Sequence, residues 1–294
     1  MDAQSPAWSP QRVWATLLLA LGAVVATSWA WRDIAHIARV DEESSQVLLA
    51  LPVCLWLIWS YRKAIRGVPA EASFMGPVLI GLGWGLSWYG YNHGAQSPWH
   101  LGAVMVLVGA VWSVLGDRVM LRAWPVLVAL LFLIPVPGRV RLEIAVPLQE
   151  LTARGAEVVL VMFGMSVERT GMLLVYNDKP VRIDEACNGM RMVFALLLVC
   201  YGYAMANPLN PYMRVIIILL SPLFAVLCNI IRVVPTTIVY GKYGDAAGDT
   251  FHDISGWAMI GIAFFLLMGL VRLLEWAEVP VVVPEHQRTV AYPG

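Results

Sequence analysis

The sequence predicts an all-α, polytopic membrane protein of about eight transmembrane helices, and three observations lead to this fold class. Hydrophobic residues make up 59% of the chain and charged residues 14%, whereas about a quarter of a typical soluble domain is charged. The apolar residues come in blocks of about 17–25, the length that crosses a bilayer. The basic residues gather in the short connections between these blocks, as they do in the cytoplasmic loops of membrane proteins.

Length and apolar composition mark each expected membrane segment. The segments are residues 13–31, 46–61, 74–92, 101–116, 121–137, 187–206, 213–240 and 251–274. The third carries Gly81 and Gly85 at GxxxG spacing, which favours close contact between two helices. We expect the segments to form one domain over residues 1–294, with residues 280–294 as a disordered cytoplasmic tail.

The basic residues of the short connections predict the orientation of the chain. Residues 62–66 carry Arg62, Lys63 and Arg66, whereas residues 41–43, on the opposite side by the helix count, are Asp-Glu-Glu. Loops rich in lysine and arginine stay in the cytoplasm. We therefore expect both termini in the cytoplasm and the protein in the inner (plasma) membrane, surrounded by membrane lipids.

The connection at residues 138–186 carries too many charges to span a membrane. Residues 139–163 mix apolar and charged positions, a pattern typical of an amphipathic helix at the interface. Residues 172–176 and 181–184 predict two short strands, with the Asn-Asp-Lys-Pro turn of a β-hairpin between them. By the orientation above, both the helix and the hairpin are extracytoplasmic.

Charge and cysteine content exclude several classes of partner. The formal net charge is zero, so nothing points to nucleic acid. The four cysteines show no CxxC or Cys/His spacing, so neither a disulfide framework nor a metal site is indicated, and no cofactor is implied. Cys54, Cys200 and Cys228 lie inside apolar runs and are interpreted as small packing residues.

A cysteine, an arginine and a histidine occupy unusual positions near one membrane face. Ionisable groups in a membrane cost roughly 2.5–3.5 kcal/mol each on insertion scales, so they indicate function or a specific partner. Cys187, with Glu185 beside it, opens the sixth segment, Arg232 lies late in the seventh, and His252 opens the eighth. By the helix count these ends are all extracytoplasmic, so the three side chains can converge.

These residue types are the parts of a cysteine acyl-transfer site. The start of a helix favours a thiolate at Cys187, and Arg191, one turn further along the same face, would favour it as well. His252 could act as base for the thiol and as acid for the leaving amine. An arginine could bind the developing oxyanion.

Structural roles are open for the same residues. The arginines could pair with nearby carboxylates such as Asp253, and His252 could cap its helix. His36, His93 and His100 are interpreted as plain loop or interface residues. Composition and topology alone therefore leave the catalytic and the structural interpretation side by side.

Three motifs resemble those of the exosortase/archaeosortase family. Residues 185–191, Glu-Ala-Cys-Asn-Gly-Met-Arg, resemble its EACSGxR motif. Residues 229–233, Asn-Ile-Ile-Arg-Val, look like its NxxRV stretch, and residues 251–257, Phe-His-Asp-Ile-Ser-Gly-Trp, like its FHDxSGW stretch. The motifs stand in the right order and spacing, and the resemblance covers a core of about residues 120–275.

The resemblance implies a membrane cysteine transpeptidase without a metal or cofactor. Cys187 would be its nucleophile, Arg232 its oxyanion stabiliser or substrate holder, and His252 its acid and base. The expected supporting residues are Glu185, Arg191, Asn229 and Asp253. Archaeal members have arginine where this chain has His252, so the histidine points to the bacterial exosortase branch. Asn188, where serine is commoner, leaves the subtype and the substrate motif open.

The family's substrates are exported proteins with a C-terminal sorting signal, which consists of a short motif such as Pro-Glu-Pro, a membrane helix and a basic tail. Two other classes of protein stay open beside this one. A transporter would need ionisable residues at mid-depth with access from both sides. A non-catalytic scaffold of an exopolysaccharide export system would tolerate Cys187→Ala.

Overall fold

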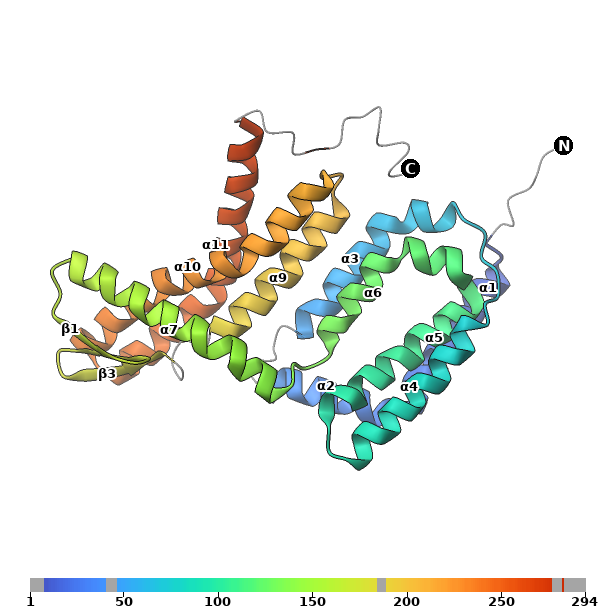
Figure 1. Ribbon diagram of the computed structural model, residues 1–294, viewed down its shortest axis with the longest axis horizontal. Helices are drawn as coiled ribbons and strands as arrows, with labels where there is room; N and C mark the ends of the chain where they lie inside the picture. Colours follow the sequence, from blue (N-terminus) through green and yellow to red (C-terminus); the bar gives the residue numbers. More distant parts are fainter. Residues whose placement is uncertain (1–7, 41–46, 184–188, 277–281, 283–294) are drawn as a thin grey trace. The chain divides into compact units, whose positions relative to one another are not determined.

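The computed structural model describes residues 8–40, 47–183, 189–276 and 282, and these form helices and one small sheet (Figure 1). The chain falls into two compact units. The first consists of Met1–Pro137 with Met205–Pro208 and Val282–Gly294, and the second of Gly138–Ala204 with Leu209–Val281. The expectation of one functional domain over the whole chain stays a prediction.

The helices of the first unit follow the expected apolar blocks. They are α1 (Pro10–Ala26), α2 (Ser28–Val40), α3 (Val47–Arg66), α4 (Met75–Asn92), α5 (Gln96–Arg122) and α6 (Trp124–Leu130), followed by the 3₁₀ turn η2 (Leu131–Leu133). Residues 13–31, expected as one segment, divide at Thr27 between α1 and α2, which are bent by 76°. The Thr27 hydroxyl donates to the carbonyl oxygen of Ala23 and accepts from the indole of Trp31, so side-chain bonds hold the break.

Glycines hold α4 and α5 together, and the two helices run side by side (Figure 1). The glycines at this contact are Gly76, Gly83, Gly90, Gly102 and Gly109. A Cβ on Gly83 would lie 2.8 Å from the carbonyl oxygen of Gly102, so the backbones meet directly. The expected GxxxG contact through Gly81 and Gly85 is wrong, because a Cβ at either position would meet nothing within 4 Å. On α4 the heptad-spaced glycines, and not the GxxxG pair, face the partner helix.

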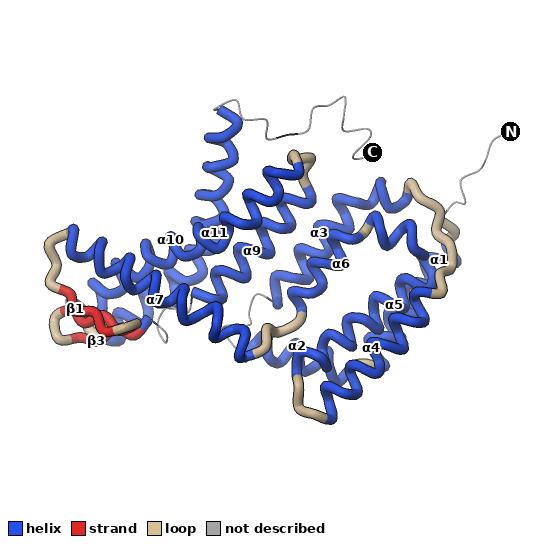
Figure 2. The backbone as a smooth tube through the Cα atoms, in the orientation of Figure 1, coloured by secondary structure: helices blue, strands red, loops and turns tan. Residues whose placement is uncertain are grey.

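The second unit contains the sheet and the last three helices. Its elements are α7 (Gly138–Met162), β1 (Val167–Thr170), β2 (Leu173–Tyr176), β3 (Lys179–Arg182), α9 (Gly189–Ala206), α10 (Pro211–Tyr243) and α11 (Asp245–Trp276). The helix expected at 139–163 is confirmed as α7, and its place at the membrane interface stays a prediction. The hairpin is confirmed, but it is part of a three-stranded antiparallel sheet in the order β1-β2-β3 (Figure 2).

The turn between β2 and β3 is tighter than the sequence suggested. Asn177 and Asp178 have φ values of 52° and 59°, so these two residues alone make the turn, and Lys179 already pairs with Tyr176. The strand expected at 181–184 therefore begins two residues earlier. The sheet, α7 and α10 share one apolar core, made of Ala153, Ala156, Leu160, Leu174, Ile183 and Val233.

The length and composition of the helices fit a polytopic membrane protein. Among the described residues, three helices (α3, α5 and α10) are long and apolar enough to cross a membrane, and up to six spans result if each bent pair counts as one. Each of the eight expected segments lies largely in helix. The all-α polytopic class is confirmed, and eight spans stays a prediction from the apolar blocks. The expected disordered tail lies outside the described residues, except for Val282.

Candidate active site

A sharp corner in the chain brings Arg232 and His252 together. Helix α10 ends at Tyr243, and Gly244 has φ 84° and ψ −178°, a conformation that a residue with a Cβ rarely adopts. Helix α11 starts at the next residue and packs back along α10. Arg232 and His252 lie 12 and 8 residues from this corner, so the antiparallel return sets them opposite each other.

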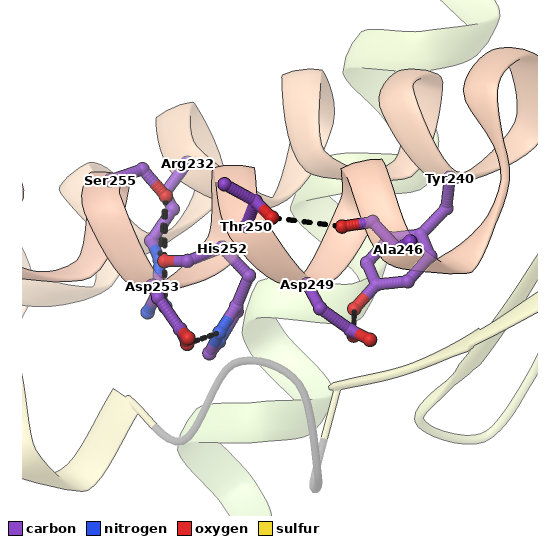
Figure 3. Close-up of polar contacts among 8 residues, drawn as sticks. All are labelled: Arg232, Tyr240, Ala246, Asp249, Thr250, His252, Asp253 and Ser255. Atoms are coloured by element: carbon purple, nitrogen blue, oxygen red, sulfur yellow. Dashed lines mark hydrogen bonds and ion pairs between the residues drawn. The ribbon is translucent and has the colours of Figure 1, made fainter.

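Arg232 is buried, with 1% of its surface exposed, and it reaches from α10 to two groups on α11. Its Nη2 donates to the carbonyl oxygen of His252 at 3.0 Å, and its Nε donates to the Ser255 hydroxyl at 3.3 Å (Figure 3). The Ser255 hydroxyl in turn donates to the same His252 carbonyl oxygen at 3.0 Å. A buried guanidinium needs such acceptors, since an uncompensated buried charge is strongly destabilising.

His252 is held from its other side by its neighbour in sequence. Its Nδ1 and Asp253 Oδ1 are 3.1 Å apart (Figure 3). Asp253 itself is exposed, and 14% of the His252 side chain is exposed. A carboxylate at Nδ1 favours the tautomer that carries its proton there, which leaves Nε2 as the atom for proton transfer. Nε2 is buried in the structure.

Asn229 lies one turn before Arg232 and joins α10 to α7. Its Nδ2 donates to the hydroxyl of Thr152 at 3.4 Å, and its side chain is buried. Among the described residues, Asn229 Oδ1 has no hydrogen-bond partner. One acceptor is therefore buried within one helical turn of the guanidinium.

The sheet fixes the position of Ile183, the last described residue before Cys187. The turn docks on the corner of α10 and α11, where Asn177 Nδ2 donates to the Gly241 carbonyl oxygen and Lys179 pairs with Asp245, both at 3.4 Å. Ile183 follows β3, is fully buried, and belongs to the same core as Val233, the residue after Arg232. Ile183 therefore anchors the chain near Arg232, four residues before Cys187.

The structure describes the positions of some of the expected site residues, and others lie outside the described residues. Arg232 of α10 contacts His252 of α11, Asp253 contacts the His252 ring, and Asn229 lies three residues before Arg232. Their catalytic and supporting roles stay predictions. Cys187 and Glu185 lie outside the described residues, and Arg191 belongs to α9 with a side chain that is not described. Within the described part of the chain, no three His, Cys, Asp or Glu side chains form a metal-binding group.

Ser255 is the contact that the sequence analysis missed. It belongs to the quoted FHDxSGW stretch and follows His252 by three residues, which places both on one helical face. This three-residue spacing could have identified Ser255 as a neighbour of His252 from the sequence. The interpretation of His100 as a plain loop or interface residue was also wrong. His100 is fully buried in α5, and its Nε2 lies 2.9 Å from Asp33 Oδ2 of α2.

The fold and this cluster define a class of protein, namely a polytopic membrane protein with a buried arginine–histidine site at a helix corner. A family model described as transmembrane exosortase matches residues 31–269. The chain therefore belongs to the transmembrane exosortase family. No curated protein and no solved structure matches it.

Proposed function

We propose that the protein is a membrane-embedded cysteine transpeptidase that cleaves the C-terminal sorting signal of exported proteins. Cys187 is the nucleophile, Arg232 stabilises the oxyanion, and His252 transfers protons. Family membership supports the reaction class. The observation that carries the assignment is the 3.0 Å hydrogen bond from Arg232 Nη2 to the His252 carbonyl oxygen, because it unites two motifs that come from different helices.

The first stage forms a thioester. His252 Nε2 accepts the proton of the Cys187 thiol, and the thiolate attacks the scissile carbonyl carbon. A guanidinium N–H stabilises the oxyanion of the tetrahedral intermediate. Two bonds to α11 hold the guanidinium in place, so it needs little reorganisation during the reaction. The C–N bond then breaks, His252 Nε2 gives a proton to the leaving amine, and the C-terminal membrane helix of the substrate departs.

The second stage resolves the thioester. An amine or a water molecule attacks the thioester carbonyl carbon and loses its proton to His252 Nε2, and the C–S bond breaks to return the Cys187 thiolate. Asp253 keeps the imidazole oriented in both stages through the contact with Nδ1. The site lies on the extracytoplasmic side in this proposal, so a substrate helix can enter it from the bilayer.

Reach along the chain supports Cys187 as the nucleophile. Cys187 is the fourth residue after Ile183, and an extended chain covers at most about 3.3–3.6 Å per residue. This chain length limits the distance from Ile183 to about 14 Å, and Ile183 shares its core with Val233, the residue after Arg232. The other three cysteines are buried within α3, α9 and α10.

The test is processing of an exported protein with a C-terminal sorting signal, expressed together with this chain in cell membranes. The expected result is a shortened product that has lost its C-terminal helix. Cys187→Ala should abolish this product, whereas Cys54→Ala, Cys200→Ala and Cys228→Ala should leave it largely unchanged. Normal processing by Cys187→Ala would exclude the proposed chemistry and favour a non-catalytic role.

A further inference from the structure

A cavity of about 430 Å³ lies within the first unit, lined by side chains from α3, α5 and α6. Its volume falls within the range of about 300–1,000 Å³ that is common for small-molecule sites. All its lining residues are described, and the only polar groups among their side chains are Arg62, Arg66, the Trp8 indole and the Cys54 thiol. An apolar chain with a charged end therefore suits this cavity better than a polar metabolite.

One stripe of α3 forms a wall of the cavity. Leu51, Leu55 and Ile58 recur at helical spacing, and the stripe continues into Arg62 and Arg66. The three apolar residues are also exposed, so an acyl chain can reach them. Leu51 and Arg62 are separated by about 16 Å of helix, close to half of a hydrocarbon core of about 30 Å. The stripe thus matches the depth of one leaflet.

Hydrogen-bond donors gather at one end of the stripe. The guanidinium of Arg62 lies 3.9 Å from the ring centroid of Trp59 and donates to the Trp59 carbonyl oxygen at 2.6 Å. Trp8 packs on the same apolar cluster as Ile65, the residue before Arg66. Its indole Nε1 is buried and has no acceptor among the described residues. The lining holds two arginines and no acidic side chain, so no carboxylate balances their charge at this end of the cavity.

We propose that the cavity binds an anionic phospholipid of the surrounding bilayer. One acyl chain fills the apolar part beside Leu51 and Leu55, and the phosphate accepts hydrogen bonds from Arg62 and Arg66. Arginine suits this role, because its planar fork donates two parallel bonds to phosphate and its long stem reaches the interface. The site is separate from the Arg232 cluster and does not depend on the proposed chemistry.

Native mass spectrometry of the full chain in detergent tests the charge requirement. The probes are phosphatidylglycerol and phosphatidylcholine with identical acyl chains. Phosphatidylglycerol should bind more tightly, and the double variant Arg62→Gln/Arg66→Gln should weaken its binding about tenfold or more. The matched control is Lys63→Gln/Arg122→Gln, which removes two exposed charges outside the cavity and should change little. Equal binding of both lipids, or equal loss in both double variants, would overturn the proposal.

The reactivity of the Cys54 thiol shows whether the acyl chain enters the cavity. Cys54 lines the cavity, and the rest of its side chain is buried. Phosphatidylglycerol should slow alkylation of Cys54 by a maleimide at concentrations where phosphatidylcholine does not. Val111→Trp, which fills the cavity and keeps both arginines, should reduce phosphatidylglycerol binding. An unchanged alkylation rate would place the lipid elsewhere. A dimer in the mass spectra that persists in place of the lipid would assign the cavity to a second copy of the chain.

Discussion

The guanidinium of Arg232 and the carbonyl oxygen of His252 are joined by a hydrogen bond of 3.0 Å that links α10 to α11. This bond uses the backbone of His252 and leaves its imidazole for other chemistry. The arginine is therefore positioned by the same residue whose side chain is the proposed acid and base. A substitution of Arg232 removes this bond, whereas a substitution of the His252 side chain keeps the carbonyl oxygen that accepts it.

The first prediction concerns the fork of donors on Arg232. Arg232→Lys keeps the charge but cannot bond the His252 carbonyl oxygen and the Ser255 hydroxyl in the same plane. Substrate processing should fall by about 10²–10³, the usual loss for one oxyanion donor. The measurement is the processing rate in membranes, together with the alkylation rate of Cys187, which should stay normal.

Two controls separate catalysis from packing at this site. Ser255→Ala removes one acceptor of the guanidinium and keeps the bond to the His252 carbonyl oxygen. A hydrogen bond to a charged group contributes about 1.5–3 kcal/mol, so processing should fall by less than it does in Arg232→Lys. Arg191→Lys should retain much of the activity, since its proposed role requires only a positive charge near Cys187. If Arg232→Lys processed substrate almost normally, the oxyanion role of Arg232 would have to be given up.

Apolar block length predicted the helices well, and the errors have local physical causes. The break at Thr27 escaped notice because two side-chain hydrogen bonds, and not a proline or glycine, hold it. Strand β1 was missed because its sequence, Val-Glu-Arg-Thr, is too short and too charged to stand out. Its pairing with β2 supplies the stability that its own composition does not suggest.

For the candidate site, the sequence predicted which helices meet but not how they are bonded. Motif order and helix direction were enough to place Arg232 beside His252. The bond to a backbone carbonyl oxygen could not be predicted, because every residue offers that acceptor and only the crossing of α10 and α11 selects one. Ser255 was identifiable in principle from its spacing to His252, since three residues on a helix share a face.

The second prediction is the orientation of the chain in the membrane. A reporter fused after Gly67 should give a cytoplasmic signal, and reporters fused after Tyr176 or Gly244 an extracytoplasmic one. The basis is the charge of Arg62, Lys63 and Arg66 under the positive-inside rule. A cytoplasmic signal at Tyr176 would place the corner of α10 and α11 on the wrong face for exported substrates.

The third prediction concerns the buried pair of His100 and Asp33. Asp33→Ala should destabilise the protein by about 1–3 kcal/mol, because it leaves a fully buried imidazole without its acceptor. The measurement is thermal unfolding in detergent. His100→Ala should lose a similar amount, and the double variant should lose less than the sum of the two. Strictly additive losses would show that the pair contributes no coupling energy. The control is His93→Ala, which changes an exposed histidine and should leave the unfolding temperature nearly unchanged.

The last prediction tests which glycines of α4 face α5. Gly83→Ala places a Cβ 2.8 Å from the Gly102 carbonyl oxygen and 2.9 Å from the Val106 amide nitrogen. Backbone atoms cannot swing aside as a flexible side chain can, so the helices must separate, at a cost of about 1–3 kcal/mol. Gly81→Ala and Gly85→Ala meet nothing within 4 Å, and alanine favours helix over glycine by about 0.5–1 kcal/mol. These two variants should therefore match or exceed the thermal stability of the parent in detergent, whereas Gly83→Ala should unfold at a lower temperature. The opposite order would mean that the GxxxG pair makes the contact and that α4 is rotated about its axis relative to the structure.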